Sequence, residues 1–470
     1  MVEAGRIGAK EVAPMLRLDN DQPSLWESVL PAELFQMSEE LAQVDRMLDE
    51  ERFFAPFRER FYTRVGRPTV PIATYLRMMY LKGRYKLGYE SLVKEVSDSF
   101  TWRRFCHLSL KDRVPDDTTL IKLTRKYGEG TLDDINDALV LKLKEERVIK
   151  GRKLRMDTMV TEANIHYPTD SGLLADGIRV ITRTVAKLKQ VGAGIGNGFV
   201  NHTRKVKKTC LGISKVLKER ISRNSPKMVK AKEGLIKIAE EVIARGRRVK
   251  AQIEALQEKP SWASRLAEQL GGWLEGTEKV VAQTEAVLKG RLSLPRRVVS
   301  IFDTGARPIR RGKARADTEF GRKVIIGETD HGIITMHEVL QENPADATLL
   351  KTGVKGHRRL FRKRLKAVAT DRGFYSQANE EWLHKGGVKH VSIPARGKAS
   401  KDRRMEQKRP WFRRLQRFRA GSEGRISLLK RVFGLGRCLM RGNQGAAIWV
   451  GQGIFAHNLW QAARINVRNR

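Results

Sequence analysis

The spacing of hydrophobic residues divides the chain into helical and strand-rich stretches. Residues 1–26 are polar and weakly patterned, which predicts a flexible N-terminal segment. Apolar positions then recur at helical spacing, which predicts a helical domain over residues 27–148. Inside it, one helix from about Val70 and another from about Tyr89 flank a break at Gly88, a pattern typical of a helix-turn-helix.

Basic and aromatic residues beside this predicted turn allow two interpretations. In the first, they contact phosphate groups or stack on bases, and the candidates are Arg84, Lys86, Trp102, Arg103 and Arg104. In the second, Trp102 and Phe105 only fill the core of the small domain.

The pattern changes at Lys153. The stretch LRMDTMVTEANIHYPTD alternates and is rich in β-branched residues, which predicts a strand with Asp157 at its middle and allows a second one. We assign residues 149–173 to the first part of an α/β core. Residues 174–295 return to helical spacing and form a predicted basic insertion.

Part of this insertion, from Asn201 to Ala255, is predicted to be a coiled helical hairpin. It holds 16 Lys and Arg against 5 Glu, so Lys207 and Lys208 are candidate DNA contacts. A merely solvated helix face is the alternative.

Residues 296–470 complete the predicted core. Short apolar runs predict strands at VVSIFD, KVIIGETD, IITMHEVL, KAVATD and VKHVSIP. Helical stretches are expected near residues 346–352 and 377–384, and strands alternating with helices suggest a mixed α/β layer. A basic linker (residues 395–419), a helix over about 421–433 and an apolar tail packing as a helix on the sheet follow.

Charge indicates the partner. The 470 residues carry 92 Lys and Arg against 53 Asp and Glu, a formal net charge of +39, and nucleic acid is the usual polyanion for such an excess. No stretch approaches the roughly 20 apolar residues of a membrane-spanning helix, so we expect a cytoplasmic, nucleoid-associated protein without a membrane partner. Cys106, Cys210 and Cys438 are far apart, and we expect them to be reduced and structural.

Two aspartates lie in or at the end of apolar strands, where a buried negative charge needs a compensating partner. Asp157 is inside an apolar strand, and Asp371 ends the strand KAVATD before Gly373 turns the chain away. With one glutamate from a helix beside the sheet, such carboxylates make an oxygen cluster suited to Mg²⁺ or Mn²⁺. Paired metals can assist in-line displacement at a phosphodiester.

The segment SEGRISLLKR resembles the glutamate helix of bacterial insertion-sequence transposases with a DDE core, whose signature is Tyr-x2-Arg-x3-Glu-x6-Lys. Arg419, Glu423 and Lys430 occupy three of its positions, and Gln416 stands at the tyrosine position with Trp411 and Phe412 nearby. Further similarity lies in DTMVTEANIHYPTDSGLL, in VATDRGFYSQANE, and in GRPTVP with VPDDTTL.

This resemblance implies an RNase H-like core in which Asp157, Asp371 and Glu423 are catalytic and hold two Mg²⁺ ions, or Mn²⁺. It implies that Arg419 and Lys430 grip DNA phosphate, and we add neighbouring Arg425. The implied activity is cleavage at the inverted-repeat ends of an insertion sequence and joining of 3′ ends to target DNA, by a homodimer or higher assembly. The alternatives are a catalytically silent DNA-binding protein derived from a transposase and a related nuclease without strand transfer.

Other acidic and polar residues compete for these roles. Asp303 also follows an apolar run, but its basic neighbours favour a structural turn. Glu380 and Glu381 lie on a helix expected to run away from the strand end. His166 is more simply a turn residue, and GAGIGNG lacks the Lys-Ser/Thr ending of a phosphate loop and is a linker.

Overall fold

The computed structural model describes residue 17 and residues 29–60, 69–218, 225–310, 318–361 and 365–468. These form two compact units: unit 1 comprises Met1–Thr161 with Lys323–Arg470, and unit 2 is Glu162–Arg322. The flexible segment predicted over residues 1–26 lies, except for one residue, outside the described part. The predicted insertion, residues 174–295, lies within unit 2, which begins earlier and ends later.

The N-terminal part of unit 1 is helical. Its helices are α1 (Glu39–Leu48), α2 (Ala55–Arg60), α3 (Ile72–Tyr85), α4 (Tyr89–Asp98), α5 (Phe100–Phe105) and α6 (Asp117–Glu145), with 3-10 turns η2 (Ala32–Phe35) and η3 (Glu51–Phe53). Lys86 adopts a left-handed conformation (φ 55°) that ends α3, and α4 begins at the predicted Tyr89. Phe105 is fully buried in the core, as the second interpretation of these aromatic residues predicted.

The other main feature is a mixed β-sheet. Its strands are β1 (Lys153–Ala163), β2 (Arg307–Arg310), β3 (Thr318–Glu328), β4 (Ile334–Val339), β5 (Ala367–Ala369), β6 (His390–Ser392) and β7 (Arg437–Cys438). The order is β2-β3-β1-β5-β6, with β4 also paired to β3 and β7 to β1. The β3 and β4 strands are antiparallel, whereas β5 is parallel to β1 and to β6. This confirms the predicted α/β class, with the strand of Asp157 inside the sheet.

Helices cover both faces of the sheet. One face packs on α11 (Asp346–Phe361) and α12 (Gln377–Lys385) through an apolar cluster that includes Met156 and Phe374. The opposite face packs on α14 (Pro410–Arg431), which follows the shorter α13 (Lys401–Lys408). The two predicted helical stretches near 346–352 and 377–384 are therefore confirmed, although α11 is longer.

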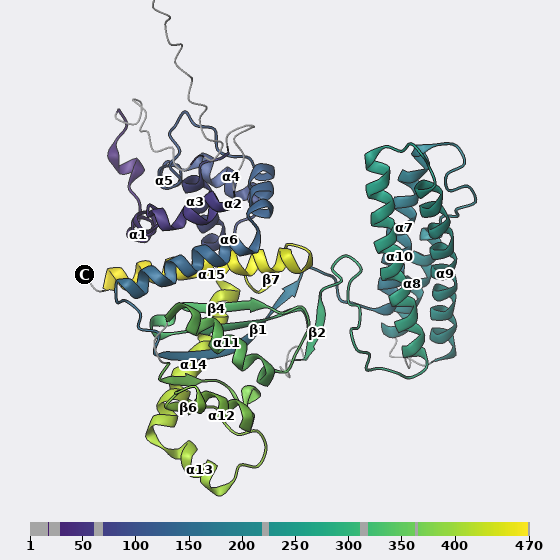
Figure 1. Cartoon of the computed structure of the whole chain (residues 1–470). Coiled ribbons are helices and arrows are strands. Elements are labelled where there is room, and N and C mark those ends of the chain that lie inside the picture. Colours follow the sequence, from purple (N-terminus) through teal and green to yellow (C-terminus); the bar gives the residue numbers. More distant parts are fainter. Residues whose placement is uncertain are drawn as a thin grey trace, which may run out of the picture. The chain divides into compact units, whose positions relative to one another are not determined.

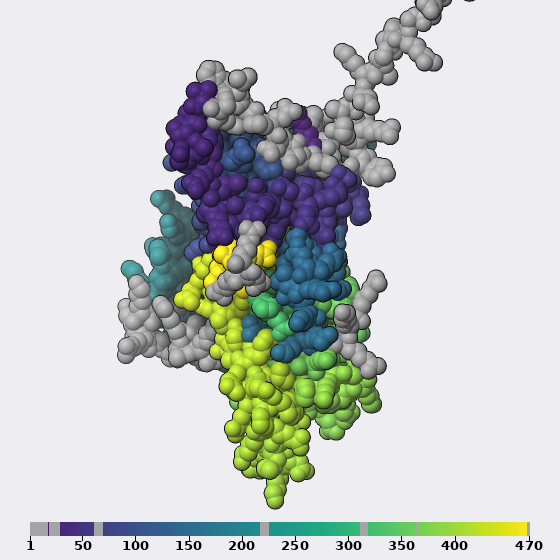
Figure 2. Space-filling model, turned by 90° about the vertical axis from the view of Figure 1, so that its left-hand side faces the viewer, coloured from purple at the N-terminus to yellow at the C-terminus, as the bar shows by residue number. Residues whose placement is uncertain are grey.

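The C-terminal helix α15 (Gly442–Arg468) joins the helical region to the sheet. It packs against α6, α3 and β4, and Figure 1 shows it in yellow between the two layers. Figure 2 shows the purple N-terminal helices directly against it. Asn458 donates to Asn136 of α6 and exchanges hydrogen bonds with the main chain of Ile334. The predicted helical packing of the apolar tail on the sheet is correct, and the same helix also serves the N-terminal core.

Two sequence-based predictions were wrong. The run VVSIFD is not a strand, because Ser300 Oγ accepts hydrogen bonds from the backbone N–H groups of Phe302 and Asp303 and turns the chain. The basic linker predicted over 395–419 is largely helical, since α14 starts at Pro410 and buries Phe412 and Leu415.

Unit 2 is built around four helices. These are α7 (Asp170–Leu188), α8 (Thr203–Lys218), α9 (Pro226–Glu254) and α10 (Ser261–Leu288), with a 3-10 turn η4 (Lys189–Val191) after α7. They bury a continuous apolar core, and Lys207 and Lys208 lie exposed on α8. The insertion is thus a helical bundle, of which α8 and α9 make up the predicted hairpin.

Candidate active site

Alternation along β1 gives its two faces different tasks. Leu154 and Met156 pack toward α11, whereas Arg155 and Asp157 lie on the face covered by α14. Asp157 is only 8% exposed. Its Oδ1 accepts from the main-chain N–H of Thr158 (2.8 Å). The Asp157 carboxyl group is thereby held inside the sheet.

Asp371 lies two residues beyond the end of β5. Its Oδ1 accepts from the backbone N–H of Gly373 (2.9 Å), which caps the 3-10 turn η6 (Arg372–Phe374). A Cβ at Gly373 would lie 3.1 Å from this oxygen and 2.9 Å from Asp346 Oδ2, so substitution there would press on both carboxylates. Gly373 is thus the turn that carries the chain out of the sheet, as predicted.

The helix α14 brings Glu423 to the same edge. Arg419 Nη1 donates to Glu423 Oε1 (2.9 Å), and Arg419 Nη2 donates to Asp157 Oδ2 (3.2 Å). Ser422 Oγ donates to the same Asp157 oxygen (2.9 Å). A single guanidinium therefore faces two carboxylates that are far apart in sequence. We call Asp157, Asp371 and Glu423 the sheet-edge triad.

The electrostatics of Asp157 reflect this crowding. Burial raises the pKa of Asp157 above its ordinary value, Arg419, the Thr158 N–H and Ser422 partly offset that rise, and the negative charge of Asp371 adds to it. Asp371 is therefore close enough to repel Asp157. A second cation at this edge would offset both the burial of the Asp157 carboxylate and its repulsion by Asp371.

A buried glutamate fixes α14 against the sheet. Glu328, at the end of β3 and 1% exposed, accepts from Arg155 Nε (2.6 Å) and from Arg425 Nε (3.1 Å) of α14. Arg155 also donates to the main-chain carbonyl of Phe418. Gly421 permits this approach, because a Cβ there would lie 2.3 Å from Arg155 Nη1. We call this arrangement of Glu328, Arg155 and Arg425 the Glu328 clamp. It fixes the part of helix α14 that carries Arg419 and Glu423.

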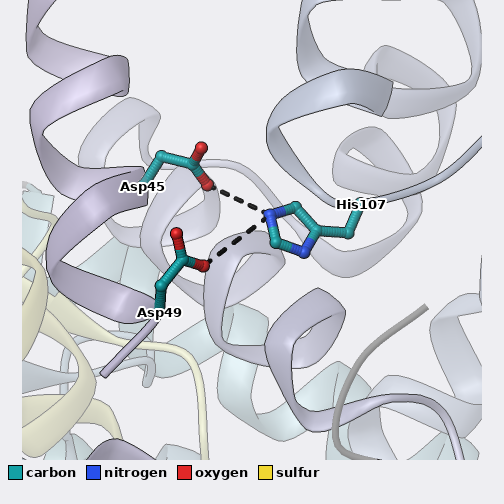
Figure 3. A group of neighbouring side chains, drawn as sticks. All are labelled: Asp45, Asp49 and His107. Carbon is teal, nitrogen blue, oxygen red and sulfur yellow. Dashed lines mark hydrogen bonds and ion pairs between the residues drawn. The ribbon is translucent and has the colours of Figure 1, made fainter. Parts of the chain in front are cut away.

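A second acidic cluster lies in the helical region. Asp45 and Asp49 approach His107 Nε2 at 3.3 and 4.0 Å, as Figure 3 shows. In the part of the chain that the structure describes, this is the one group of three such residues whose ligand atoms all lie within 4.8 Å of one another. The oxygens of the sheet-edge triad are therefore more widely spaced. We call Asp45, Asp49 and His107 the α1 cluster.

The α1 cluster already holds a cation. Arg77, fully buried on α3, donates to Asp45 Oδ1 (2.7 Å) and to Asp49 Oδ1 (2.5 Å). Burial alone would raise the pKa of Asp45, but the hydrogen bond with His107 and the charge of Arg77 outweigh burial and leave it lowered. Arg77 thus ties α1 to α3 and offsets part of the negative charge of the two carboxylates.

The predicted DNA-contact residues fall into two groups. Arg103 is buried and donates to the main-chain oxygens of Ser109 and Asp112, and Arg425 belongs to the Glu328 clamp and contacts His457 (2.7 Å). Both arginines therefore stabilise the fold through these contacts, and we do not propose them as DNA contacts. The others are accessible to different degrees: Arg104, Lys207 and Lys208 are exposed, and Lys430 is half-buried in the last turn of α14.

The competing residues have partners of their own. Asp303 forms a buried bidentate ion pair with Arg322 (2.9 and 2.5 Å), in line with the structural role favoured above. Glu380 pairs with Arg403, and His166 lies 3.3 Å from Asp176. In the described residues, none of these joins the sheet-edge triad.

Sequence patterns did not point to Ser422, Arg155 or Glu328. Arg155 had one available signal, since it lies two residues from Asp157 and so shares its face of β1. Ser422 lies three residues after Arg419 on α14, a helical neighbour. Glu328 gave no signal, because its two partners are distant in the chain.

Comparisons with known proteins found two family models that match the chain. The family model "Transposase domain (DUF772)" matches residues 31–126, and the "Transposase DDE domain" model matches residues 296–459, which include Asp371 and Glu423. No curated protein and no solved structure matches significantly. None of the described helices combines the length and apolar character needed to cross a membrane. The mixed sheet is the RNase H-like core of this DDE domain, and the chain belongs to the insertion-sequence DDE transposases.

Proposed function

We propose that this transposase cleaves DNA at the ends of its insertion sequence and joins the 3′ ends to target DNA at the sheet-edge triad. One observation carries the proposal: Asp157 and Glu423, 266 positions apart, share the guanidinium of Arg419, and Asp371 lies within electrostatic reach of Asp157. Carboxylates are gathered in this way, at a desolvation cost, where a cation compensates them.

The residues suit hard divalent cations. All three triad members offer carboxylate oxygens, the ligands that Mg²⁺ and Mn²⁺ prefer. Glu423 is mostly exposed, with a side chain 69% accessible, so it can adjust as a ligand. Two ions bound there would supply an activated water or 3′-hydroxyl and stabilise the leaving oxygen of an in-line displacement.

Arg419 has two tasks in this proposal. In the structure it occupies the charge-balancing position between Asp157 and Glu423. If divalent cations were held by the triad, they would take over this charge compensation, and the guanidinium of Arg419 would be available to a DNA phosphate. The Glu328 clamp keeps the backbone of α14 in place during this exchange, which makes Glu328 a positioning residue.

The DNA-binding surface is proposed from exposed cations. On α8, Lys207 and Lys208 lie beside Arg204 and Lys205, so four positive charges follow one short stretch of helix. Arg104 adds an exposed cation on α5, and Lys430 lies two turns after Glu423 on α14. A homodimer or higher assembly would present two such sites to the paired inverted-repeat ends.

The test is Mg²⁺-dependent cleavage of DNA that carries the flanking inverted repeats. We expect Asp157→Asn, Asp371→Asn and Glu423→Gln each to reduce the rate on the order of 1000-fold, because each loses part of the transition-state charge stabilisation. Glu381→Gln, an exposed carboxylate on α12, is the matched control and should cut at the parental rate. Triad variants that cut as fast as the parent would remove this site assignment.

A second assay separates the activities. Pre-cut element ends with free 3′-hydroxyls are offered with target DNA and Mg²⁺. Joined products from wild type, absent with Asp157→Asn, support strand transfer. Cleavage without joining indicates a nuclease, and DNA binding without either reaction indicates a silent descendant of a transposase.

A further inference from the structure

A cavity of about 710 Å³ lies in unit 1, away from the sheet-edge triad. It is bordered by the end of α3, the start of α4, the first turns of α6, and the start of α15 with the residues just before it. A smaller cavity of about 250 Å³ shares Lys82, Leu87, Leu439 and Trp449 with it. The larger volume is within the range of small-ligand sites.

Lys82 carries an unusual charge at the junction of these cavities. It is 7% exposed, and its Nζ lies 4.7 Å from the centre of the Tyr89 ring and 4.4 Å from that of Trp449. Among the described residues, these two rings and the nearby Cys438 are the partners of Lys82 Nζ, and no carboxylate forms an ion pair with it. Burial lowers the pKa of Lys82 to about 8, so the ammonium form still prevails at neutral pH. A buried ammonium facing a cavity is most simply compensated by an anion.

Two helix N-termini meet the same cavity. Gly88, the N-cap of α4, supplies no side-chain hydrogen bond to the first turn, and the first residues of α15, from Gly442 to Gly445, line the opposite side. Unpaired N–H groups and the helix dipole make each terminus favourable for an anion. Arg125, exposed on α6, adds a positive charge at the rim.

The rest of the cavity wall contains Arg441 and several apolar side chains, and its aromatic rings are held in place. Leu87, Ile121 and Ile448 line it. Trp449 Nε1 donates to the carbonyl of Gly434 (3.2 Å), and the Tyr89 hydroxyl donates to Thr124 Oγ1 (3.2 Å). The two rings beside Lys82 are therefore fixed before any ligand enters, which reduces the ordering cost of binding.

We propose that this cavity, the Lys82 pocket, binds a nucleotide. The phosphate lies against Lys82 and the two helix N-termini, and the base lies against the apolar side chains of the wall. A phosphate alone would leave most of the volume unused, and an apolar molecule would leave the ammonium unpaired. A free nucleotide and an unpaired nucleotide of a DNA strand have this same chemistry. The proposal does not depend on the triad.

Calorimetric titration of the full chain with deoxyadenosine 5′-monophosphate, in EDTA so that metal-dependent reactions are silent, tests the proposal. We expect saturable binding that Lys82→Met weakens at least about tenfold, the loss of one charge-assisted contact. The control is Lys94→Met, which removes the same charge from an exposed position of α4 that does not line the pocket. It should bind as the parent does.

Other ligands and a second variant complete the design. Deoxyadenosine, which lacks the phosphate, and inorganic phosphate should each bind more weakly than the monophosphate. Arg125→Gln, at the exposed rim, should weaken binding several-fold and serves if Lys82→Met does not fold. If a single-stranded oligonucleotide competes with the monophosphate, the pocket binds a nucleotide of a DNA strand. If the oligonucleotide does not compete, the pocket binds free nucleotides. No binding to wild type, equal binding to Lys82→Met, or equal affinity for inorganic phosphate would overturn the proposal.

Discussion

The α1 cluster and the sheet-edge triad are both groups of acidic residues around an arginine, but they differ in their spacing and in the burial of that arginine. The α1 cluster has the tighter spacing, and its Arg77 is fully buried with both carboxylates as partners. The triad is more open, and its Arg419 pairs with a glutamate that is largely in solvent. The tighter group is the one whose carboxylates already share a buried cation.

This difference shows why proximity alone is a poor guide to a metal site. Close spacing of acids in a metal-free fold requires a cation that the protein supplies itself, and such a cation is costly to remove once buried. Acids that await an external cation instead stay farther apart. The same reasoning yields three ways to test the comparison.

The largest expected effect comes from the same substitution in both groups. Arg77→Leu should lower the free energy of unfolding by about 2–4 kcal/mol, because it removes a fully buried guanidinium that bonds to Asp45 and to Asp49. Arg419→Leu should change it by less than about 1 kcal/mol, since Asp157 keeps its bonds from Thr158 and Ser422. Urea unfolding followed by circular dichroism measures both. Equal losses would contradict the distinction between a structural tie and an adjustable site.

A smaller effect is expected from loosening the Glu328 clamp. Glu328→Gln keeps the shape but removes the charge that Arg155 and Arg425 share, so Arg419 and Glu423 lose their fixed backbone. We expect a decrease of about 10–100-fold in kcat for cleavage, with little change in the affinity for element DNA. Glu381→Gln is again the control. A loss of DNA affinity with unchanged kcat would argue against a positioning role.

The smallest effect is a contrast in pH dependence. Asp157 has a raised pKa in the folded state, so its favourable protonated form contributes stability at low pH that is lost as the pH rises through the folded pKa. Asp45 has a lowered pKa, so its contribution is present above its unfolded pKa and is lost as the pH falls through the folded pKa. Relative to wild type, Asp157→Asn should therefore gain stability with rising pH and Asp45→Asn should lose it. Unfolding curves between about pH 3 and pH 8 measure this, and parallel trends would contradict it.

Much of the fold could be predicted because local patterns carried it. The alternation around Asp157, the strand ending before Asp371 and the break near Gly88 all reflect nearest-neighbour preferences. These features depend on residues a few positions apart.

The wrong predictions arose where a high density of charge hid a helical pattern, or where a residue's partners are distant in the sequence. The start of α14 is so basic that its helix was taken for a linker, although Pro410 and the buried pair Phe412 and Leu415 were available signals. The partners of Arg425 and Arg103 could not be inferred from composition, because a surface arginine and a clamped one look alike in sequence. Lys82 gave no signal for the same reason.

The position of α15 has a consequence for synthesis on the ribosome. This helix covers apolar surface on α3, α6 and β4, yet it is translated after every strand and after Glu423. A nascent chain therefore exposes those surfaces, and its core stays incomplete, until α15 has emerged. We expect that a chain released before this point is captured by chaperones or degraded before it can act on a chromosome.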